Sequence, residues 1–395
     1  MSTTFGSRIG TDYFFLRESM TAEQKSWFDR TRRFVDAEVI PVMPDYWDRA
    51  EFPRPVIDKL GPLGLVGGTI SGYGCPGMDP LSSGLVSMEL SRGDGSLATF
   101  VGVQGGLAMA SIALLGSAEQ KQRWLPEMAA LRKLGAFALT EPDHGSDSIG
   151  LETSAQRSGD TWTINGRKKW IGNGSISDVT VVWARDTADG QVKGFLVDVA
   201  TVTGYEGVKI EGKGSLRSVW QAEITLTDVK VDEADRLPGA RSFADCARVL
   251  TGTRQDCAWM ALGLATAGYD AALAYAKERK QFGKPLAAFQ IVQERLVKML
   301  ADITAMQLYC VQIAHLAASG RLEPTLAGLA KLHNTSKART VLAAARDMLG
   351  GNGILLDRQV IKHMADIEAV HTFEGTETMQ TLIVGRDITG LSAFA

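Results

Sequence analysis

The order of strand and helix patterns along the chain is the feature that most constrains the fold. Over residues 136–244, β-branched and aromatic residues alternate with polar ones, as in the runs 161–164 and 179–183. An alternation of period two is typical of strands with one buried face. Further strands are expected at residues 194–199, 208–210 and 222–229. Asn165 and Gly166, flanked by strand-like runs, predict a hairpin turn of type I′. We therefore expect a compact β domain in the middle of the chain.

The segments on either side of this region carry helical patterns. Thr21 precedes an amide- and charge-rich turn, as a helix-capping hydroxyl does. After the β region, apolar residues recur at helical spacing, or Ala dominates, over residues 256–280 and 289–318. A further helix is expected to open at Pro324 and to close at Gly350-Gly351. Long helices with apolar faces predict a bundle.

A chain of 395 residues is too long for one simple core, and these patterns divide it into three parts. We expect an α+β fold with an N-terminal all-α domain (residues 1–135), a middle β-barrel or sandwich domain (136–244) and a C-terminal four-helix bundle (245–395).

Composition excludes several classes of function. The formal net charge of −3 gives no electrostatic case for binding nucleic acid or an anionic membrane surface. The four cysteines are scattered without metal-ligand or disulfide spacing, so we expect reduced core or pocket residues and no metal site. No apolar run is expected to span a membrane, and the N-terminus has no hydrophobic signal core. We expect a cytoplasmic protein.

The first candidate for chemistry is Glu374, in the stretch V-H-T-F-E-G-T-E-T-M-Q. A carboxylate between Phe373 and Gly375 can lie at the mouth of an apolar pocket, where desolvation raises its pKa toward that of a useful general base. Gly375 allows close approach of a ligand, and Thr376 adds a hydroxyl for a phosphate or ribose. Taken alone, such a triplet is more often a turn with a solvated Glu.

A second candidate is a strand followed by a loop rich in Gly, Ser and Asp, residues 135–147. Backbone N–H groups near Gly145 and Ser146 can cradle a phosphate, and Thr140 offers a hydroxyl to a flat heterocycle. An ordinary Asx-type turn is the more common explanation of such a loop taken alone.

Three further stretches carry residues suited to a nucleotide. Trp170, in K-K-W-I-G-N, can lie against a flat aromatic ligand, although a buried strand Trp is more common. In R-K-Q-F-G, Arg279 can form a bidentate contact with a pyrophosphate, and Phe282 can stack on a base. Taken alone, the stretch is more often a basic helix C-terminus that complements the helix dipole. In D-M-L-G-G-N-G, residues 347–353, the backbone can approach a nucleotide or only cap a helix.

In this order the motifs L-T-E-P-x-x-G-S-D, K-x-W-I-x-N, R-x-Q-F-G, L-G-G-N-G and E-G-T resemble the acyl-CoA dehydrogenase family over essentially the whole chain. The similarity is closest to the branch of glutaryl-CoA dehydrogenases and plant short-chain acyl-CoA oxidases, which share stretches like residues 277–286 and 372–376. The resemblance implies that FAD oxidises an acyl-CoA thioester to the trans-2-enoyl-CoA and that Glu374 is the base. It also implies electron transfer to an electron-transferring flavoprotein.

The resemblance assigns site residues by motif. The cofactor-binding residues that it implies are Phe137, Leu139, Thr140, Gly145, Ser146, Trp170, Ile171, Gly172, Arg279, Phe282, Gln290, Asp347, Gly350, Gly351, Thr376 and Thr378. The substrate-binding residues that it implies are Ser146, Arg254, Glu374 and Gly375. The resemblance implies that six of the cofactor-binding residues reach FAD of a neighbouring subunit and that Thr376 closes the site; the six are Arg279, Phe282, Gln290, Asp347, Gly350 and Gly351. It therefore implies a homo-oligomer, usually a tetramer.

Three departures from the family pattern keep alternatives open. Gly172 stands where many dehydrogenases have a Thr whose hydroxyl bonds the flavin, so an oxygen-using acyl-CoA oxidase is an alternative. Residues 96–100 are neutral where glutaryl-specific members place an Arg, which disfavours a decarboxylating glutaryl-CoA dehydrogenase. Thr378 and Asp347 replace residues often seen at their positions. A binding or stress protein and a flavin monooxygenase of this fold are disfavoured by Glu374, which such relatives typically lack.

Overall fold

The computed structural model describes residues 11–394, and its N-terminal part is helical. The helices of this part are α1 (Ala22–Phe34), α2 (Met43–Arg49), α3 (Arg54–Ile57), α4 (Pro80–Gly93), α5 (Gly95–Val101), α6 (Ala110–Leu115) and α7 (Ala118–Ala129). A short hairpin, β1 (Ser71–Gly72) and β2 (Cys75–Pro76), precedes α4. The expected cap at Thr21 is present as a capping box with Gln24, and Ser117 forms the same motif with Gln120.

The stretch between α5 and α6 is π-helical, over Gly102–Met109, so the chain runs as one helix from Gly95 to Leu115. Single π-turns inside helices are frequent at functional sites, and this one carries Gly102, Gly105 and Gly106. Gly106 lets the helix pack closely on α8 (Phe243–Glu278), because a Cβ there would lie 3.1 Å from Thr253 Cγ2.

The expectation that no apolar run could span a membrane was wrong by length and composition. Gly95–Leu115 and Gln290–Ala318 both reach that length, with hydropathies of 1.7 and 1.2. In Gly95–Leu115, 61% of the most apolar window is buried inside the protein, so its hydropathy is that of a core helix. The corresponding share for Gln290–Ala318 is 44%, which leaves apolar residues on its surface.

The middle of the chain is one seven-stranded sheet. Its strands are β3 (Gly135–Ala138), β4 (Ser154–Ser158), β5 (Thr161–Gly172), β6 (Val179–Asp186), β7 (Val192–Asp198), β8 (Tyr205–Lys209) and β9 (Gln221–Asp232). The order is β3-β6-β4-β5-β9-β8, with β7 paired to β6. Trp162, Val182, Phe195 and Ile224 belong to a core that is separate from the helical one.

The predicted hairpin at Asn165-Gly166 was wrong. β5 runs through both residues, and the turn that joins β4 to β5 lies earlier, at Gly159 and Asp160. Gly166 instead marks a register shift between β5 and β9. A Cβ at Gly166 would lie 2.4 Å from Thr153 Oγ1, so close packing on the neighbouring chain, and not a turn, requires this glycine.

The C-terminal part is again helical. It contains α8 (Phe243–Glu278), α9 (Gln290–Ala318), α10 (Pro324–Met348), α11 (Val360–Thr372) and α12 (Glu377–Thr389). A small hairpin, β10 (Lys280–Gln281) and β11 (Lys284–Pro285), joins α8 to α9. α8 starts thirteen residues before the expected position at 256, because the capping box of Ser242 and Asp245 opens it.

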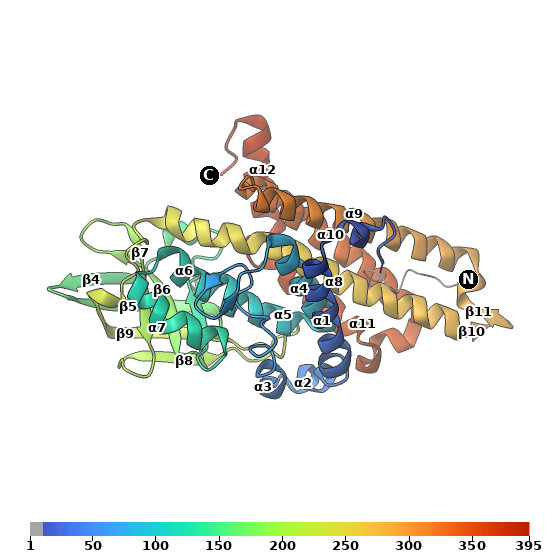
Figure 1. The fold of residues 1–395 in the computed structure, drawn as a ribbon, viewed down its shortest axis with the longest axis horizontal. Helices are drawn as coiled ribbons and strands as arrows, with labels where there is room; N and C mark the ends of the chain where they lie inside the picture. Colours follow the sequence, from blue (N-terminus) through green and yellow to red (C-terminus); the bar gives the residue numbers. More distant parts are fainter. Residues whose placement is uncertain (1–10, 395) are drawn as a thin grey trace.

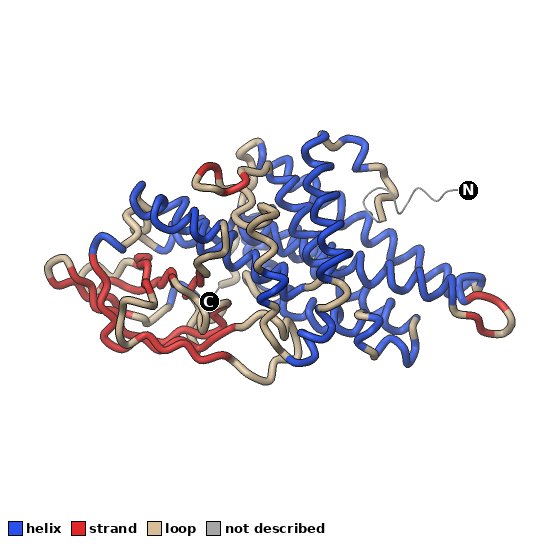
Figure 2. Tube along the Cα trace, turned by 60° about the horizontal axis from the view of Figure 1, so that its bottom comes forward, coloured by secondary structure: helices blue, strands red, loops and turns tan. Residues whose placement is uncertain are grey.

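The β sheet and the β10–β11 hairpin lie at opposite ends of the elongated molecule, with the long helix α8 running between them (Figure 1). The seven-stranded sheet lies at one end, and helices make up most of the rest apart from the small hairpins β1–β2 and β10–β11 (Figure 2). α4 packs directly on α8, where Ser91 Oγ donates to the carbonyl oxygen of Met260 at 2.8 Å. Helical N- and C-terminal parts around a β-sheet part confirm the expected fold class.

Candidate active site

The loop between α11 and α12 presents Glu374 in a constrained backbone conformation. Glu374 has φ 58° and Gly375 has φ 89°, both in the left-handed region that most residues avoid. Gln380 Nε2 donates to the carbonyl oxygen of Glu374 at 2.9 Å. The buried Lys331 ammonium of α10 donates to the carbonyl oxygens of Gly375 and, at 3.2 Å, His371. These bonds hold a strained loop in one shape.

The Glu374 carboxylate is held by one hydroxyl. Thr253 Oγ1, on α8, lies 2.9 Å from Glu374 Oε2 and donates to it. Desolvation raises the pKa of Glu374 above its ordinary value, while the Thr253 hydrogen bond and the charges of Arg254 and Lys331 oppose that rise. Arg254 Nε is buried and has no hydrogen-bond partner among residues 11–394. The site therefore keeps a basic carboxylate beside an unsatisfied cation.

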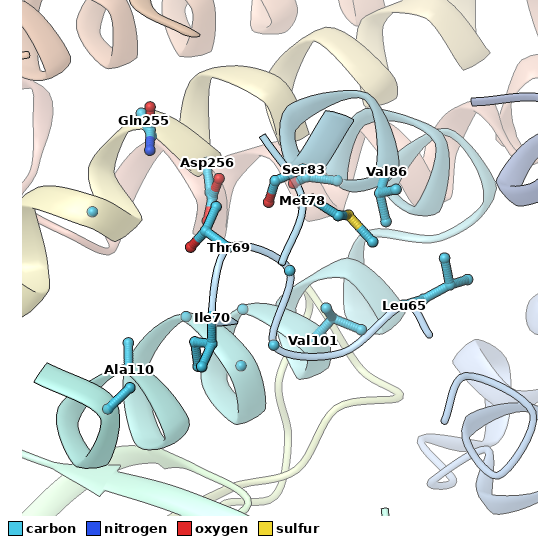
Figure 3. Close-up of a pocket in the computed structure, with 18 of the residues that line it drawn as sticks. Leu65, Thr69, Ile70, Met78, Ser83, Val86, Val101, Ala110, Gln255 and Asp256 are labelled. Carbon is cyan, nitrogen blue, oxygen red and sulfur yellow. The ribbon is translucent and has the colours of Figure 1, made fainter. Parts of the chain in front are cut away.

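A cavity of about 390 Å³ lies beside this pair. Its walls come from α4, the π-helical segment, the loop around Gly67 to Ser71, and α8 (Figure 3). Glu374 is not among its lining residues. Gly252 and Asp256 line it on either side of Thr253 in the sequence, so the Thr253–Glu374 hydrogen bond lies at its edge. The volume falls in the range of small-molecule sites.

Two of the sequence motifs meet at the end of the sheet. The buried Lys168 ammonium donates to Leu139 O at 2.9 Å and to Glu141 Oε1 at 2.8 Å. Burial lowers the pKa of Lys168 to about 8, opposed by the charge of Glu141. Lys169 N donates to Thr140 O at 2.9 Å. These contacts fix the ends of β3 and β5 against each other and explain why L-T-E-P and K-x-W-I occur together.

Trp170, at this junction of β3 and β5, is unusual in its exposure and its backbone conformation. It is 55% exposed and has φ 63°, an uncommon combination for a large apolar residue in a strand. Phe137, Leu139 and Ile171 are buried beneath this edge, and Thr140 is half-buried. Gly145 and Ser146 are exposed in the following loop. The hydroxyls of Thr140 and Ser146 form no hydrogen bond within the described part of the chain.

Close packing explains why residue 172 is a glycine. A Cβ at this position would lie 2.7 Å from Val103 Cγ2 of the π-helical segment. The contact joins the end of β5 to a segment that lines the cavity. The absence of a side chain at Gly172 is thus compatible with a close approach between the sheet and the N-terminal helices.

The remaining predicted cofactor residues lie elsewhere. Phe282 is 93% exposed at the tip of the β10–β11 hairpin, far from the sheet (Figure 1). Arg279 and Gln290 flank this hairpin and are exposed. Asp347 pairs with Arg295, and a Cβ at Gly350 or Gly351 would meet nothing within 4 Å. One chain therefore does not bring this group together with Trp170.

Near Glu374, two predicted residues are found at the start of α12. The Thr376 hydroxyl accepts a hydrogen bond from Met379 N at 3.3 Å and so caps the helix. Thr378 is exposed in its first turn. These residues lie within four positions of Glu374 and connect its loop to α12.

Sequence profiles of the acyl-CoA dehydrogenase N-terminal, middle and C-terminal domains match residues 21–132, 136–229 and 243–389. The chain belongs to the acyl-CoA dehydrogenase family. It is 32% identical to the probable acyl-CoA dehydrogenase YngJ of Bacillus subtilis, over 93% of this chain and 98% of the relative.

Solved structures agree with this membership. A glutaryl-CoA dehydrogenase from Mycobacterium smegmatis has a TM-score of 0.95 at 39% identity and covers 98% of this chain and 99% of its own. A glutaryl-CoA dehydrogenase from the same organism, in complex with FADH2, has a TM-score of 0.95 at 34% identity, over 98% of this chain and all (100%) of its own. The expected family, enzyme class and cofactor are confirmed: this acyl-CoA dehydrogenase is a flavoprotein oxidoreductase that uses FAD.

The residues present fit a flavin. Trp170 is exposed on a left-handed backbone at the sheet edge, as a surface for a flat ring requires, and the hydroxyls of Thr140 and Ser146 beside it have no partner among residues 11–394. Phe282, exposed on its hairpin, fits a contact with the cofactor of another chain.

Sequence reasoning missed several residues of this site. Lys331 and Gln380 hydrogen-bond to the loop of Glu374, and Asp256 lines the cavity. Lys331 could have been found, because it shares the buried face of α10 with Ala327, Ala330 and Asn334 at helical spacing. A lysine on an otherwise small and apolar helix face must find acceptors inside the protein. Asp256 gives no such signal, because only the fold shows that it faces a cavity.

Proposed function

We propose that the protein dehydrogenates an acyl-CoA thioester between its α- and β-carbons, with Glu374 as the base that removes the α-proton. The observation that carries the proposal is the Thr253–Glu374 hydrogen bond, which holds a desolvated carboxylate beside the cavity. The raised pKa of Glu374 makes it a stronger base than a solvated Glu. FAD, when bound, supplies the oxidising power by accepting the β-hydrogen as hydride at N5.

The protein's own groups have distinct tasks in this reaction. The proton goes to the Glu374 carboxylate, which Thr253 orients. The backbone N–H of Glu374 makes no hydrogen bond within residues 11–394, so it is free to donate to the thioester oxygen as that oxygen gains enolate charge. Lys331 and Gln380 fix the loop so that both groups keep their positions.

Short-chain acyl-CoA thioesters fit the cavity best. Its walls are mainly apolar, and Leu65, Val86 and Val101 limit its depth. Ala98, in the neutral stretch where glutaryl-specific relatives place an Arg, lines the cavity. A distal carboxylate would meet no cation there, which disfavours glutaryl-CoA. Lys121 and Arg248 also line the cavity, and Arg248 lies two turns of α8 away from Asp256.

We also propose a homotetramer in the cytoplasm that passes electrons to an electron-transferring flavoprotein. Val297 and Leu308 are exposed on the same face of α9, and an exposed apolar helix face needs a partner. Phe282, on the hairpin that leads into α9, is in turn placed to reach the cofactor of a second chain. The partner protein and the location rest on the family resemblance and on the composition.

An acyl-CoA oxidase is the second candidate. Gly172 offers no hydroxyl beside the flavin, and its contact with Val103 leaves little room for one. Many dehydrogenases have a Thr here whose hydroxyl bonds the flavin. The lack of this hydrogen bond is the feature that favours reaction of the reduced enzyme with oxygen.

The test is an anaerobic titration of the FAD-loaded enzyme with butyryl-, isobutyryl-, hexanoyl- and glutaryl-CoA. Flavin bleaching with formation of the trans-2-enoyl-CoA is expected for the short monocarboxylic thioesters. Fast reoxidation by electron-transferring flavoprotein and slow reoxidation by air support the dehydrogenase, whereas rapid peroxide release in air supports the oxidase. Bleaching by none of the thioesters would refute the proposed function.

A further inference from the structure

The wall of the cavity is not uniformly apolar. Asp256, Thr69, Ser83 and Ser87 line it, and none of their side-chain oxygens forms a hydrogen bond with a residue in the described range 11–394. Figure 3 shows Asp256 reaching from α8 toward Thr69, with Ser83 of α4 beside them. Asp256, Ser83 and Ser87 are half-buried and line the cavity with their unpaired oxygens, while Thr69 lines it and is also exposed to solvent.

Asp256 carries the only carboxyl group among these four polar side chains and is their strongest hydrogen-bond acceptor. A Cβ at Gly106 would lie 3.8 Å from Asp256 Oδ2, which places this carboxylate against the π-helical wall. Desolvation, and then the charge of Glu374, raises the pKa of Asp256 to about 7, and no cation of the described chain opposes the rise. Arg248, which also lines the cavity, lies two helical turns away on α8, about 12 Å along the axis.

A hydrocarbon chain alone would leave this wall unsatisfied. Covering an unpaired carboxyl and its neighbouring hydroxyls with methylene groups removes their water and returns no hydrogen bond, at a cost of roughly 10- to 100-fold in affinity. A group that donates hydrogen bonds would satisfy Asp256 and offset its repulsion by Glu374. A distal carboxylate would add a third negative charge to the same region.

We propose that the acyl group of the natural substrate ends in a hydrogen-bond donor, a protonated amine or a hydroxyl, which Asp256 binds with Thr69 and Ser83. The inference rests on the proposed function and narrows its substrate class. Asp256 is a specificity residue here, and Glu374 remains the base. The apolar residues Val86, Val101 and Ile70, which line the same cavity, contact the methylene part of the chain.

The experiment compares kcat/KM for matched thioesters at butyryl, valeryl and hexanoyl length, each with an ω-methyl, ω-hydroxyl, ω-amino or ω-carboxyl end. The enzyme is the FAD-loaded oligomer, assayed with an artificial electron acceptor. We expect the ω-amino or ω-hydroxyl thioester to exceed the plain one at least about tenfold at one length, and the ω-carboxyl thioester to be the poorest. The amino and hydroxyl arms distinguish a cationic from a neutral donor.

Asp256→Asn and Asp256→Leu then test the residue. Asp256→Leu should remove or reverse the preference for a polar end, and Asp256→Asn should reduce it for the amine more than for the hydroxyl. Glu206→Gln, an exposed carboxylate on β8, is the matched control and should keep the wild-type preference. FAD content and melting temperature establish whether each variant is folded. If Asp256→Leu does not fold, the result for Asp256→Asn decides the test.

Three outcomes separate the two claims. A polar-end preference that depends on Asp256 supports the inference. Oxidation of plain acyl-CoA without such a preference, or a preference that both variants keep, overturns the inference and leaves the proposed function intact. Bleaching by no thioester of the series overturns the proposed function and this inference with it.

Discussion

The Thr253 hydroxyl donates to Glu374 Oε2 at 2.9 Å and so joins helix α8 to the loop before α12, 121 residues further along the chain. The bond favours the charged carboxylate, while desolvation favours the neutral acid. The pKa of Glu374 results from this opposition, so the pH at which the enzyme becomes active reports on the contact.

Replacing Thr253 by Val should shift the pH profile upward. Val keeps the shape of Thr but cannot donate, so the pKa of Glu374 rises and activity should begin at a higher pH. We expect kcat to fall several-fold at acidic pH and to recover at alkaline pH. The profile of kcat for a plain acyl-CoA measures this. Thr253→Ser, which keeps the hydroxyl, should resemble wild type; an unshifted profile in the Val variant would show that the bond does not tune the base.

Replacing Lys331 by Met should loosen the loop of the base. The buried ammonium donates to the carbonyl oxygens of His371 and Gly375, and its positive charge lowers the pKa of Glu374. We expect a loss of about 1.5–3 kcal/mol in unfolding free energy, an upward shift of the pH profile and a lower kcat. Lys337→Met, at a partly exposed lysine of α10 that pairs with Asp302, is the control; it should leave the pH profile and kcat unchanged and cost at most about 1 kcal/mol in unfolding free energy. A Lys331→Met enzyme with wild-type profile and stability would contradict the role.

Because of Asp256, the free energy of unfolding should decrease as the pH rises. Its pKa is raised from 3.8 to about 7 in the folded protein, so the folded state binds the proton more tightly than the unfolded chain. The stabilisation is complete below about pH 4 and is lost as pH rises through about 7. Asp256→Asn lacks this titration. Between about pH 5 and pH 8, the variant should gain on the order of 2 kcal/mol relative to wild type. Ligand-free melting curves measure the difference, and a constant difference would be inconsistent with a carboxyl buried in this way.

Phe282→Ala should weaken FAD binding without unfolding the chain. The side chain is 93% exposed, so its removal changes monomer stability by less than about 0.5 kcal/mol. If Phe282 contacts the cofactor of another chain, the variant should retain less FAD per subunit after dialysis. Flavin absorbance per chain and the mass of the oligomer give the answer. Full FAD retention would remove Phe282 from the cofactor site.

The sequence predicts elements best where the signal is local. The Thr21 cap and the Pro324 helix start depend on neighbouring residues alone, and both are found. Asn165-Gly166 misled because the same dipeptide serves a tight turn or a close packing contact, and only the position of Thr153 decides between them. The family motifs identified Glu374 without showing what surrounds it.

The residues that surround Glu374 could not be predicted from local sequence signals. Thr253 and Lys331 reach Glu374 from α8 and α10, and nothing local to those helices points to a loop so far along the chain. The same holds for Asp256, whose significance depends on a cavity built by α4 and the π-helical segment. Long-range packing creates these relationships, so they follow only from the fold.

The most direct test of the central claim is the reaction of Glu374→Gln with a plain short-chain acyl-CoA in the absence of oxygen. The amide keeps the size of the side chain but cannot take the α-proton. The account predicts a folded variant that retains FAD and binds the thioester, yet bleaches its flavin at least about a thousandfold more slowly than wild type. Bleaching at the wild-type rate would show that another group removes the proton.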